Sequence, residues 1–354
     1  MCPRGPELSA RPSACRAGLV LPAAVFLLLL PGLSGCTSPA PRPAGEAAPA
    51  APGARGPSTA PAAPVPYWVN PDGRAARAVA EHLAAGRTAE AELLRRISSR
   101  PQAEWIGPDR PEEDARAVTE AADRAGSEAL LVLYDIPNRD CGQHSAGGAP
   151  DAAAYRDWVD AVARGIGARR ATVVLEPDAV MHVVDGCTER RHHVERYELL
   201  KAAVQRLKRQ PSVTVHLDAG NAGWGGPERL AGPLKEAGIE DADGFAVNVS
   251  NFRTTEESAA YGRRLSALVG GKPFVIDTSR NGNGPWVEGD PVDSWCNPPG
   301  RALGAFPTRD TGDPLVSAHL WIKRPGESDG ECRGGPKAGE WFDVYARELA
   351  RGAR

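Results

Sequence analysis

The chain has 354 residues, of which 42% are apolar and 25% charged, enough for a sizeable core in one large domain or two smaller ones. Lysine and arginine number 42 against 45 aspartates and glutamates, so the formal net charge is −3. This balance excludes the strongly basic surface typical of nucleic-acid-binding proteins, and we expect no nucleic acid as a partner.

The N-terminal 35 residues have the pattern of an export signal. Basic residues precede an uncharged apolar run over 18–35. The run is short and interrupted by proline, which favours a secretory signal over a transmembrane helix. It ends in Leu-Ser-Gly-Cys at 33–36, which resembles a bacterial lipobox. We therefore expect residues 1–35 to be a lipoprotein signal peptide. Cys36 is then the lipidated first residue of an exported chain, anchored to the outer face of the cytoplasmic membrane or shed from it.

Residues 36–66 have the composition of a disordered tether. Positions 37–66 contain nine prolines and ten alanines, with no leucine, isoleucine, methionine or aromatic residue. Such a segment cannot bury a core, and its prolines favour a semi-extended conformation. We expect it to hold a folded domain away from the membrane.

From residue 67 the pattern becomes that of one α/β domain over 67–354. Short apolar runs lie around Trp105 and at 129–134, 172–176, 213–218, 244–248, 273–277 and 316–321. Helix-like stretches lie between them, for example at 152–166, 190–207, 227–237 and 254–269. Continuous apolar strands that alternate with helices are typical of a parallel sheet. About seven of them predict a (β/α) barrel of the TIM type.

Polar side chains end nearly every predicted strand. They include Tyr134 with Asp135 and Asp140 beyond it, Glu176 with Asp178, and then Asp218, Asn248, Asp277 and Lys323. The C-terminal ends of parallel barrel strands share one face, which holds the active site. We therefore expect these residues to converge on one cleft. Grouped carboxylates with tryptophans favour a carbohydrate ligand, because glycoside hydrolysis needs a pair of carboxyl groups.

Other chemistries have weaker support. His192, His193 and Glu195 lie in a highly charged predicted helix and are more typical of a solvated face than of a metal site. RNGNGP at 280–285 lacks the lysine of a phosphate-binding loop, and no GxSxG nucleophile motif occurs. We expect no metal ion and no cofactor.

Four cysteines remain beyond Cys36, namely Cys141, Cys187, Cys296 and Cys332. An even number in an exported chain predicts two disulfides, for which the sequence alone allows three pairings. Their spacing contains no CxxC, which argues against a structural zinc site.

Six sequence blocks resemble those of glycoside hydrolase family 6, the inverting cellulases, in the same order. They are YDIPNRDCG (134–142), VLEPDAV (174–180), HLDAGNAGW (216–224), DTSRNGNGP (277–285), WCNPPGRALG (295–304) and LWIKRPGESDG (320–330). The resemblance covers essentially all of 67–354. It implies a distorted seven-stranded barrel that hydrolyses β-1,4-glucosidic bonds with inversion. It also pairs Cys141 with Cys187 and Cys296 with Cys332.

The resemblance implies roles for three carboxylates. Asp178 matches the general acid, which must be protonated to give its proton to the leaving oxygen. Asp140 lies beside it, where a negative charge raises the pKa of an acid. Asp329 matches the position proposed for the base. Family members often carry a serine six positions after the equivalent of Asp140 to hold the catalytic water. That position is Ala146 here, so either Ser145 or a backbone group replaces the serine.

The same blocks imply substrate-binding positions. Tyr134 lies under the strained −1 sugar, and Asp218 shapes the site close to the acid. The other positions are Trp105, Trp224, Asn248, Trp321, Lys323 and Glu327, of which the tryptophans resemble sugar platforms. A purely structural role for Asp218, and core positions for Trp224 and Trp321, stay open as alternatives. Trp158 is interpreted as core.

The expected protein is a monomeric endo-β-1,4-glucanase that binds cellulose or a related β-glucan. Two loops that roof the cleft in processive family members correspond to 284–295 and 330–339, and both are short, which favours internal cuts. Residues 336–350 resemble exo-acting relatives, so a cellobiohydrolase is the alternative. A non-catalytic glycan-binding lipoprotein is a second alternative, although a binder has no need of Asp140, Asp178 and Asp329 together.

Overall fold

The computed structural model describes residues 64–288 and 294–353. The predicted signal peptide, Cys36 and nearly all of the predicted tether lie outside the described residues, so the lipobox and tether stay predictions.

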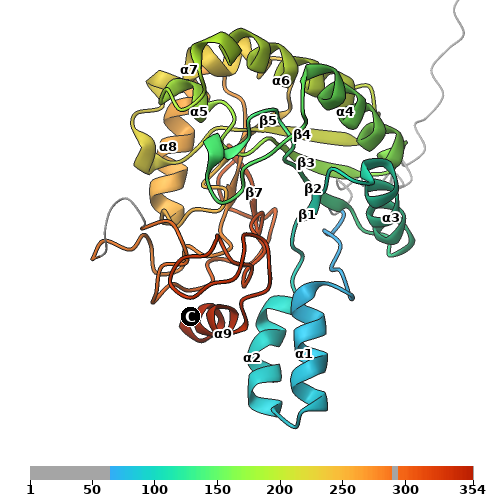
Figure 1. Ribbon diagram of the computed structural model, residues 1–354, viewed down its shortest axis with the longest axis vertical. Helices are drawn as coiled ribbons and strands as arrows, with labels where there is room; N and C mark the ends of the chain where they lie inside the picture. The colour runs from blue at the N-terminus through green and yellow to red at the C-terminus, as the bar shows by residue number, and fades with distance from the viewer. Residues whose placement is uncertain (1–63, 289–293, 354) are drawn as a thin grey trace, which may run out of the picture. The chain divides into compact units, whose positions relative to one another are not determined.

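Seven parallel strands form one sheet in chain order (Figure 1). They are β1 (Glu104–Ile106), β2 (Ala129–Leu133), β3 (Ala171–Leu175), β4 (Val213–Asp218), β5 (Gly244–Val247), β6 (Phe274–Asp277) and β7 (Val316–Leu320). β1 and β7 share no strand pairing within the described residues, but the Ala103 amide donates to the Trp321 carbonyl at 3.0 Å. The sheet is therefore a curled, incomplete barrel, which confirms the predicted fold.

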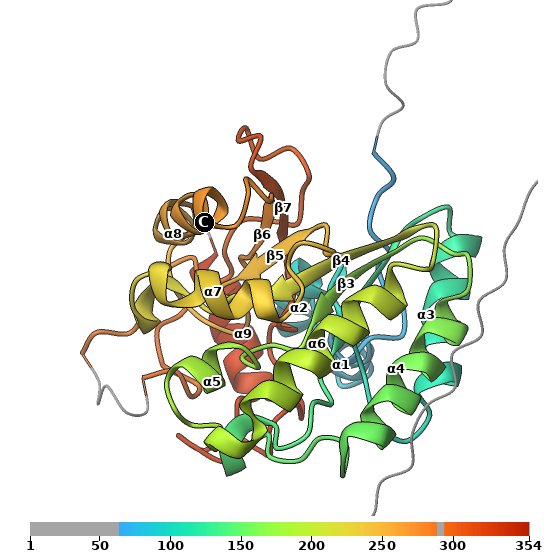
Figure 2. The same ribbon diagram turned by 90° about the horizontal axis from the view of Figure 1, so that it is seen from above.

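Six helices surround the outer face of the curled sheet (Figures 1 and 2). They are α3 (Pro111–Arg124), α4 (Ala152–Ile166), α5 (Met181–Val184), α6 (His193–Leu207), α7 (Glu228–Glu236) and α8 (Thr255–Leu268). Local sequence fixes where they begin. The Thr254 hydroxyl accepts from the Glu257 amide at 3.1 Å and the Glu257 carboxylate accepts from the Thr254 amide at 3.0 Å, a capping box that starts α8.

The strands alternate between two apolar layers, as a two-residue period requires. Leu131, Val173 and Val215 are fully buried and face the outer helices. Trp158 of α4 packs in the same cluster, so it is a core residue, as interpreted from the sequence. Leu130, Val132, Val174, Ala246, Val275 and Ala318 belong to a second buried cluster on the opposite, inner face. With both faces of the sheet covered, the polar residues are left to the strand ends.

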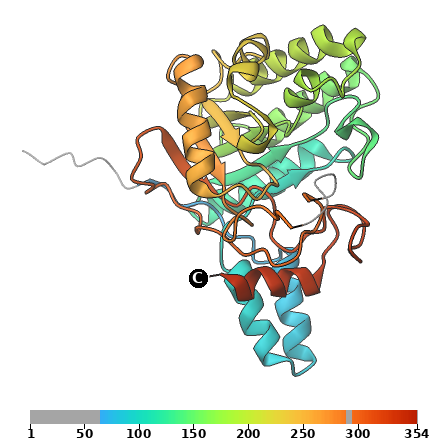
Figure 3. The ribbon, with the colours of Figure 1, turned by 90° about the vertical axis from the view of Figure 1, so that its left-hand side faces the viewer.

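A third apolar cluster lies away from the barrel. The hairpin of α1 (Arg74–Ala84) and α2 (Thr88–Ser98) packs on α9 (Asp343–Gly352), as Figure 3 shows. Its buried members include Leu94, Leu303, Trp321 and Leu349. No helix of the described ranges is long and apolar enough to cross a membrane.

Candidate active site

A cleft of about 610 Å³ lies at the C-terminal ends of the strands. Its walls come from β1, from segments that follow β1, β2, β3, β5, β6 and β7, and from the 3₁₀ turn η3 (Ala222–Trp224). Eight predicted site residues line it: Trp105, Tyr134, Asp140, Asp178, Trp224, Lys323, Glu327 and Asp329. Residues spread over more than 220 positions of the chain therefore meet in one place. Of the strand-end residues expected there, Tyr134, Asp140, Asp178 and Lys323 line the cleft. The others do not: Asp135, Glu176, Asp218, Asn248 and Asp277.

Asp178 occupies a position suited to a protonated carboxyl group. It follows β3 in a left-handed backbone conformation with φ of 68°, and its amide donates to the Asp218 carboxylate at 2.9 Å. Removal from water raises the pKa of Asp178 well above its ordinary value, and the charges of Asp218, Asp140 and Asp185 raise it further. The group can therefore hold a proton at neutral pH.

Asp218 lies behind the acid and outside the cleft lining. Its side chain is 2% exposed, and one carboxylate oxygen accepts from the amides of Asp178 and Gly220 at 2.9 and 3.1 Å. Burial raises the pKa of Asp218 to about 7. Asp218 thus positions Asp178 and repels its ionised form. This arrangement fits an acid that shapes the site, and no sugar contact is available to a side chain buried in this way.

Asp140 reaches the cleft from a compact turn, η1 (Asp140–Gly142). Its carboxylate accepts from the Ser145 amide at 2.6 Å. The Cys141–Cys187 disulfide, with a Cα–Cα distance of 6.0 Å, ties this turn to the segment that follows α5. Both Ser145 and Ala146 line the cleft, so the loop brings a serine to the site one position earlier than the family pattern.

Asp329 is held by cations. The Arg280 guanidinium donates to it at 2.8 Å and the Asn297 amide at 3.0 Å, while the Lys323 ammonium lies 3.4 Å away. Burial alone raises the pKa of this carboxyl, but Arg280 and Lys323 together hold the pKa of Asp329 below its ordinary value. Asp329 is therefore ionised, and its pairing makes it a weak proton acceptor.

Two carboxylates at strand ends accept hydrogen bonds from backbone amides of the surrounding loops. Glu176 accepts from the amide of Asp135 at 3.0 and 3.1 Å and from the amide of Ile136 at 3.0 Å. Asp277, fully buried, accepts from the amides of Ser250, Ser279, Ile322 and Lys323. Sequence reasoning placed both residues only at strand ends, because their backbone partners become visible only in three dimensions.

Aromatic side chains line the cleft on several sides. Tyr134 meets the edge of Trp105 with ring centroids 5.6 Å apart, and the Trp105 indole donates to the Ile322 carbonyl at 2.9 Å. Trp224 keeps 36% of its surface exposed, so it is available to a sugar ring. Trp295 also lines the cleft, with the His144 ring 5.8 Å away. Trp295 begins the family-like block at 295–304, but no role was predicted for it from the sequence.

Besides Asp218, two more predicted substrate-binding residues are not in the cleft. Trp321 is fully buried among the residues between the barrel and α9, and its indole donates to the Ala305 carbonyl at 3.0 Å. It is a core residue, which was the alternative left open. Asn248 is also fully buried: its amide donates to the Asp277 carbonyl at 2.8 Å and its oxygen accepts from the Arg253 amide at 3.0 Å. Asn248 therefore holds a loop, and the prediction of a substrate contact was wrong for both residues.

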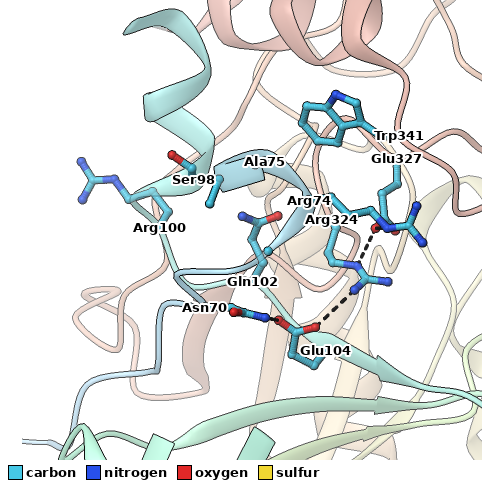
Figure 4. Close-up of a pocket in the computed structure, with 12 residues that line it drawn as sticks. Asn70, Arg74, Ala75, Ser98, Arg100, Gln102, Glu104, Arg324, Glu327 and Trp341 are labelled. Atoms are coloured by element: carbon cyan, nitrogen blue, oxygen red, sulfur yellow. Dashed lines mark hydrogen bonds and ion pairs between the residues drawn. The ribbon is translucent and has the colours of Figure 1, made fainter. Parts of the chain in front are cut away.

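Glu327 joins the cleft to a small adjacent cavity of about 20 Å³ (Figure 4). The Glu327 carboxylate is 3% exposed and pairs with Arg324 at 2.9 Å and with Arg74 of α1 at 3.1 Å. Arg324 also pairs with Glu104 at 3.2 Å, and Asn70 donates to Glu104 at 2.8 Å. This network fixes the cleft wall at Glu327. Because the Glu327 carboxylate is already paired, a sugar hydroxyl at this position contacts a cluster in which two arginines balance two glutamates.

Both predicted disulfides are in place. Cys296 and Cys332 form the second disulfide, with a Cα–Cα distance of 6.3 Å, so both pairings implied by the family resemblance occur. In the part of the chain that the structure describes, one group of side chains has metal-ligand proximity: Cys141, His182 and Cys187. Both of its sulfur atoms belong to a disulfide, so the group lacks the thiolates that bind metal ions.

The fold and the cleft together define a glycoside hydrolase: a parallel α/β barrel with a half-buried acid, a flanking carboxylate and aromatic walls at its C-terminal face. Comparison with known proteins identifies the family. The model for glycosyl hydrolases family 6 matches residues 62–353, and the chain belongs to this family. The assignment made from six sequence blocks is thereby confirmed.

Several relatives are named endoglucanases. The chain is 45% identical over 266 residues to endoglucanase A of Cellulomonas fimi, covering 74% of this chain and 56% of the relative. It is 42% identical to endoglucanase 1 of Streptomyces halstedii, covering 81% and 88% of the two chains. The chain thus spans little more than half of the C. fimi protein.

A solved relative shares the fold. The structure of the endoglucanase Cel6 from Mycobacterium tuberculosis, in complex with methyl-cellobiosyl-4-deoxy-4-thio-β-D-cellobioside, matches with a TM-score of 0.76 at 43% identity. The match covers 82% of this chain and 98% of that one.

Proposed function

We propose that this chain hydrolyses internal β-1,4-glucosidic bonds of cellulose or a related β-glucan, with inversion at the anomeric carbon. The observation that carries the proposal is Asp178, a carboxyl group kept protonated within a glycan-sized cleft by burial and by the neighbouring charges of Asp218 and Asp140. The endoglucanase names of the relatives, and the thio-linked cello-oligosaccharide in complex with the Mycobacterium relative, support the bond type and the substrate.

The chemistry follows from the positions of the groups. Asp178 gives its proton to the glycosidic oxygen as the bond between that oxygen and the anomeric carbon breaks. A water molecule adds to the anomeric carbon from the opposite face, and its proton leaves through other waters to a carboxylate. Asp140, adjacent to the Ser145 amide, is our candidate acceptor; the ionised Asp329 also lines the cleft, but its pairing with cations makes it the weaker acceptor. The pairing of Asp329 with Arg280 favours its role as a fixed negative charge near the developing oxocarbenium ion.

The direct test is hydrolysis of a soluble cello-oligosaccharide series, followed by release of reducing ends. The expected result is turnover that rises with chain length, with products that first appear as α-anomers in proton NMR. Early β-anomers would contradict inversion. Binding of the oligosaccharides without release of reducing ends would instead favour the non-catalytic glycan-binding lipoprotein.

We further propose that the enzyme acts as a monomer tethered to the outer face of the cytoplasmic membrane by a lipid on Cys36. The lipobox-like residues 33–36 and the proline- and alanine-rich segment 37–66 support this proposal. A proline-rich spacer of this kind suits an enzyme that must reach an insoluble or wall-bound polymer, because it holds the cleft away from the membrane.

A further inference from the structure

A buried arginine outside the cleft contacts both segments that carry the proposed catalytic carboxylates. Arg196 of α6 is 3% exposed. Its guanidinium donates to the carbonyls of Pro137 at 2.7 Å and Asn138 at 3.1 Å, and to the carbonyl of Ala179 at 3.4 Å. The first two residues lead into Asp140, and the third directly follows Asp178. One planar group therefore bridges the acid segment and the neighbouring carboxylate loop.

Glu176 makes a second bridge between the same two segments. It lies two positions before Asp178 and is 1% exposed. Its carboxylate accepts from the amides of Asp135 and Ile136, at the start of the loop that carries Asp140. The Glu176 charge also favours the charged form of Arg196, opposing the effect of burial on the pKa of Arg196. Burial raises the pKa of Glu176 itself to about 7, so this electrostatic support for Arg196 weakens as Glu176 takes up a proton.

The backbone in both segments needs such support. Asn138, Asp140, Cys141, Glu176 and Asp178 all have φ between 48° and 68°, the left-handed region that side chains other than glycine adopt rarely. Strained conformations of this kind persist only where the surroundings hold them, and they concentrate at active sites. Of the nine residues other than glycine with positive φ in the described part of the chain, these five are the two carboxylates and residues within two positions of them; the other four are Asn248, Ser250, Asn297 and Arg333.

We propose that Arg196, together with Glu176, is a positioning pair that sets the separation between the Asp140 and Asp178 carboxylates. The inference rests on the proposed roles of those two carboxylates in hydrolysis. Without the guanidinium, the carbonyls of Pro137 and Asn138 lose their buried donor and the loop moves away from Asp178. The negative charge of Asp140 is then farther from the proposed acid, Asp178, so Asp178 loses its proton at a lower pH.

The sign of this effect separates positioning from simple loss of charge. Removing a positive charge raises the pKa of nearby carboxyl groups, whereas moving Asp140 away lowers the pKa of Asp178. The groups that face Arg196 are Glu176 after β3, Tyr134 after β2, Tyr155 of α4, His182 of α5 and Tyr197 of α6. The carboxylates that face Asp178 are Asp218, Asp140 and Asp185.

The experiment uses Arg196→Met and Arg196→Lys, with Arg206→Met as the matched control. Arg206 is on the same helix, pairs with Asp160 and lies outside the cleft. The pH dependence of kcat/KM is measured on an unactivated cello-oligosaccharide and on a β-glucoside with a very acidic leaving group, with melting temperature as the check of folding.

We expect Arg196→Met to lose about 10- to 100-fold in kcat on the unactivated substrate, because small displacements of catalytic groups have effects of this size. The high-pH limb of the pH profile of kcat/KM should move to lower pH. The loss of kcat should be smaller on the substrate with the acidic leaving group. Arg206→Met should stay within about twofold of the wild type, as surface changes usually do.

A folded Arg196→Met enzyme with an unchanged or upward-shifted high-pH limb would overturn the proposal, as would equal losses on the two substrates. If Arg196→Met does not fold, the pH profile of Arg196→Lys tests the proposal instead. Lysine keeps the charge but cannot span three carbonyls, so the limb should still move down, and an unmoved limb would overturn the proposal. Turnover by the wild type separates failure of the proposed function from failure of this inference. An inactive wild type refutes the proposed hydrolase. An active wild type whose Arg196 variants show no shift of the high-pH limb refutes only the positioning pair.

Discussion

The ion pair of Arg280 and Asp329 gives a prediction whose size and pH dependence follow from the structure. The Arg280 side chain is fully buried, the Asp329 side chain is 6% exposed, and their charged atoms lie 2.8 Å apart. Arg280→Met leaves a buried carboxylate with one cation, Lys323 at 3.4 Å. Breaking a buried pair in this way costs about 3–5 kcal/mol at neutral pH. Arg264→Met, in the exposed pair of Arg264 with Glu228, is the control and should cost less than about 1 kcal/mol.

The pH dependence has a definite sign. The folded-state pKa of Asp329 lies below its unfolded value, so the pair contributes stability at pH values above the unfolded pKa. That contribution is lost as the pH falls through the folded-state pKa. The difference in unfolding free energy between wild type and Arg280→Met should therefore be largest at pH 7 and shrink towards acid pH.

Urea denaturation at several pH values from 7 to well below the unfolded-state pKa of an aspartate, about 3.9, measures this difference. Asp329→Asn and the double variant complete a double-mutant cycle at pH 7, in which the two losses should fall short of additivity by about 2 kcal/mol or more. A penalty for Arg280→Met that stays constant across the pH range would refute the reasoning. Additive losses in the cycle would refute it independently, because they would mean that the two charges do not interact.

Three further predictions concern the disulfides, the mode of attack and the anchor. Replacing Cys141 and Cys187 by serine should lower the unfolding free energy by about 4 kcal/mol on the chain-entropy model for a sequence separation of 46, and replacing Cys296 and Cys332 should cost nearly as much for a separation of 36. Denaturant titrations check both, and a loss below about 1 kcal/mol for either pair would contradict the model. Viscosity of a soluble substituted cellulose should fall steeply at few released reducing ends; cellobiose accumulation with little viscosity change would indicate the exo-acting alternative. Cys36→Ala should release the enzyme or leave its signal uncleaved, and unchanged detergent-dependent retention in the membrane would contradict lipid attachment.

The fold was predictable from the sequence because its signals are local. The strand-forming runs are continuous and apolar, as strands covered on both faces require, and polar residues mark their ends. The hairpin of α1 and α2 was not among the predicted helices. Its helices bury their apolar stripes against α9, more than 240 residues further along the chain, and no local pattern reveals that partner.

The errors in the site have a common physical cause: a sequence block states which residues are near the cleft and not where their side chains point. Leu320 and Ile322 face the inner layer, so the two-residue period turns Trp321 between them to the opposite side. The alternation of side chains through the end of β7 therefore predicts that Trp321 points away from the inner layer. Asn248 offered no such signal, because its partners are backbone groups of Asp277 and Arg253, whose proximity depends on how two loops pack.

The central claim, that Asp178 is the proton donor, is tested most directly by the dependence of Asp178→Ala on the leaving group. Hydrolysis of unactivated cello-oligosaccharides should nearly disappear in this variant, while their binding is largely retained. The loss should shrink strongly for substrates whose leaving group is acidic enough to depart without a proton. Equal losses on both kinds of substrate, in a variant that is folded and binds, would contradict the assignment of Asp178 as the acid.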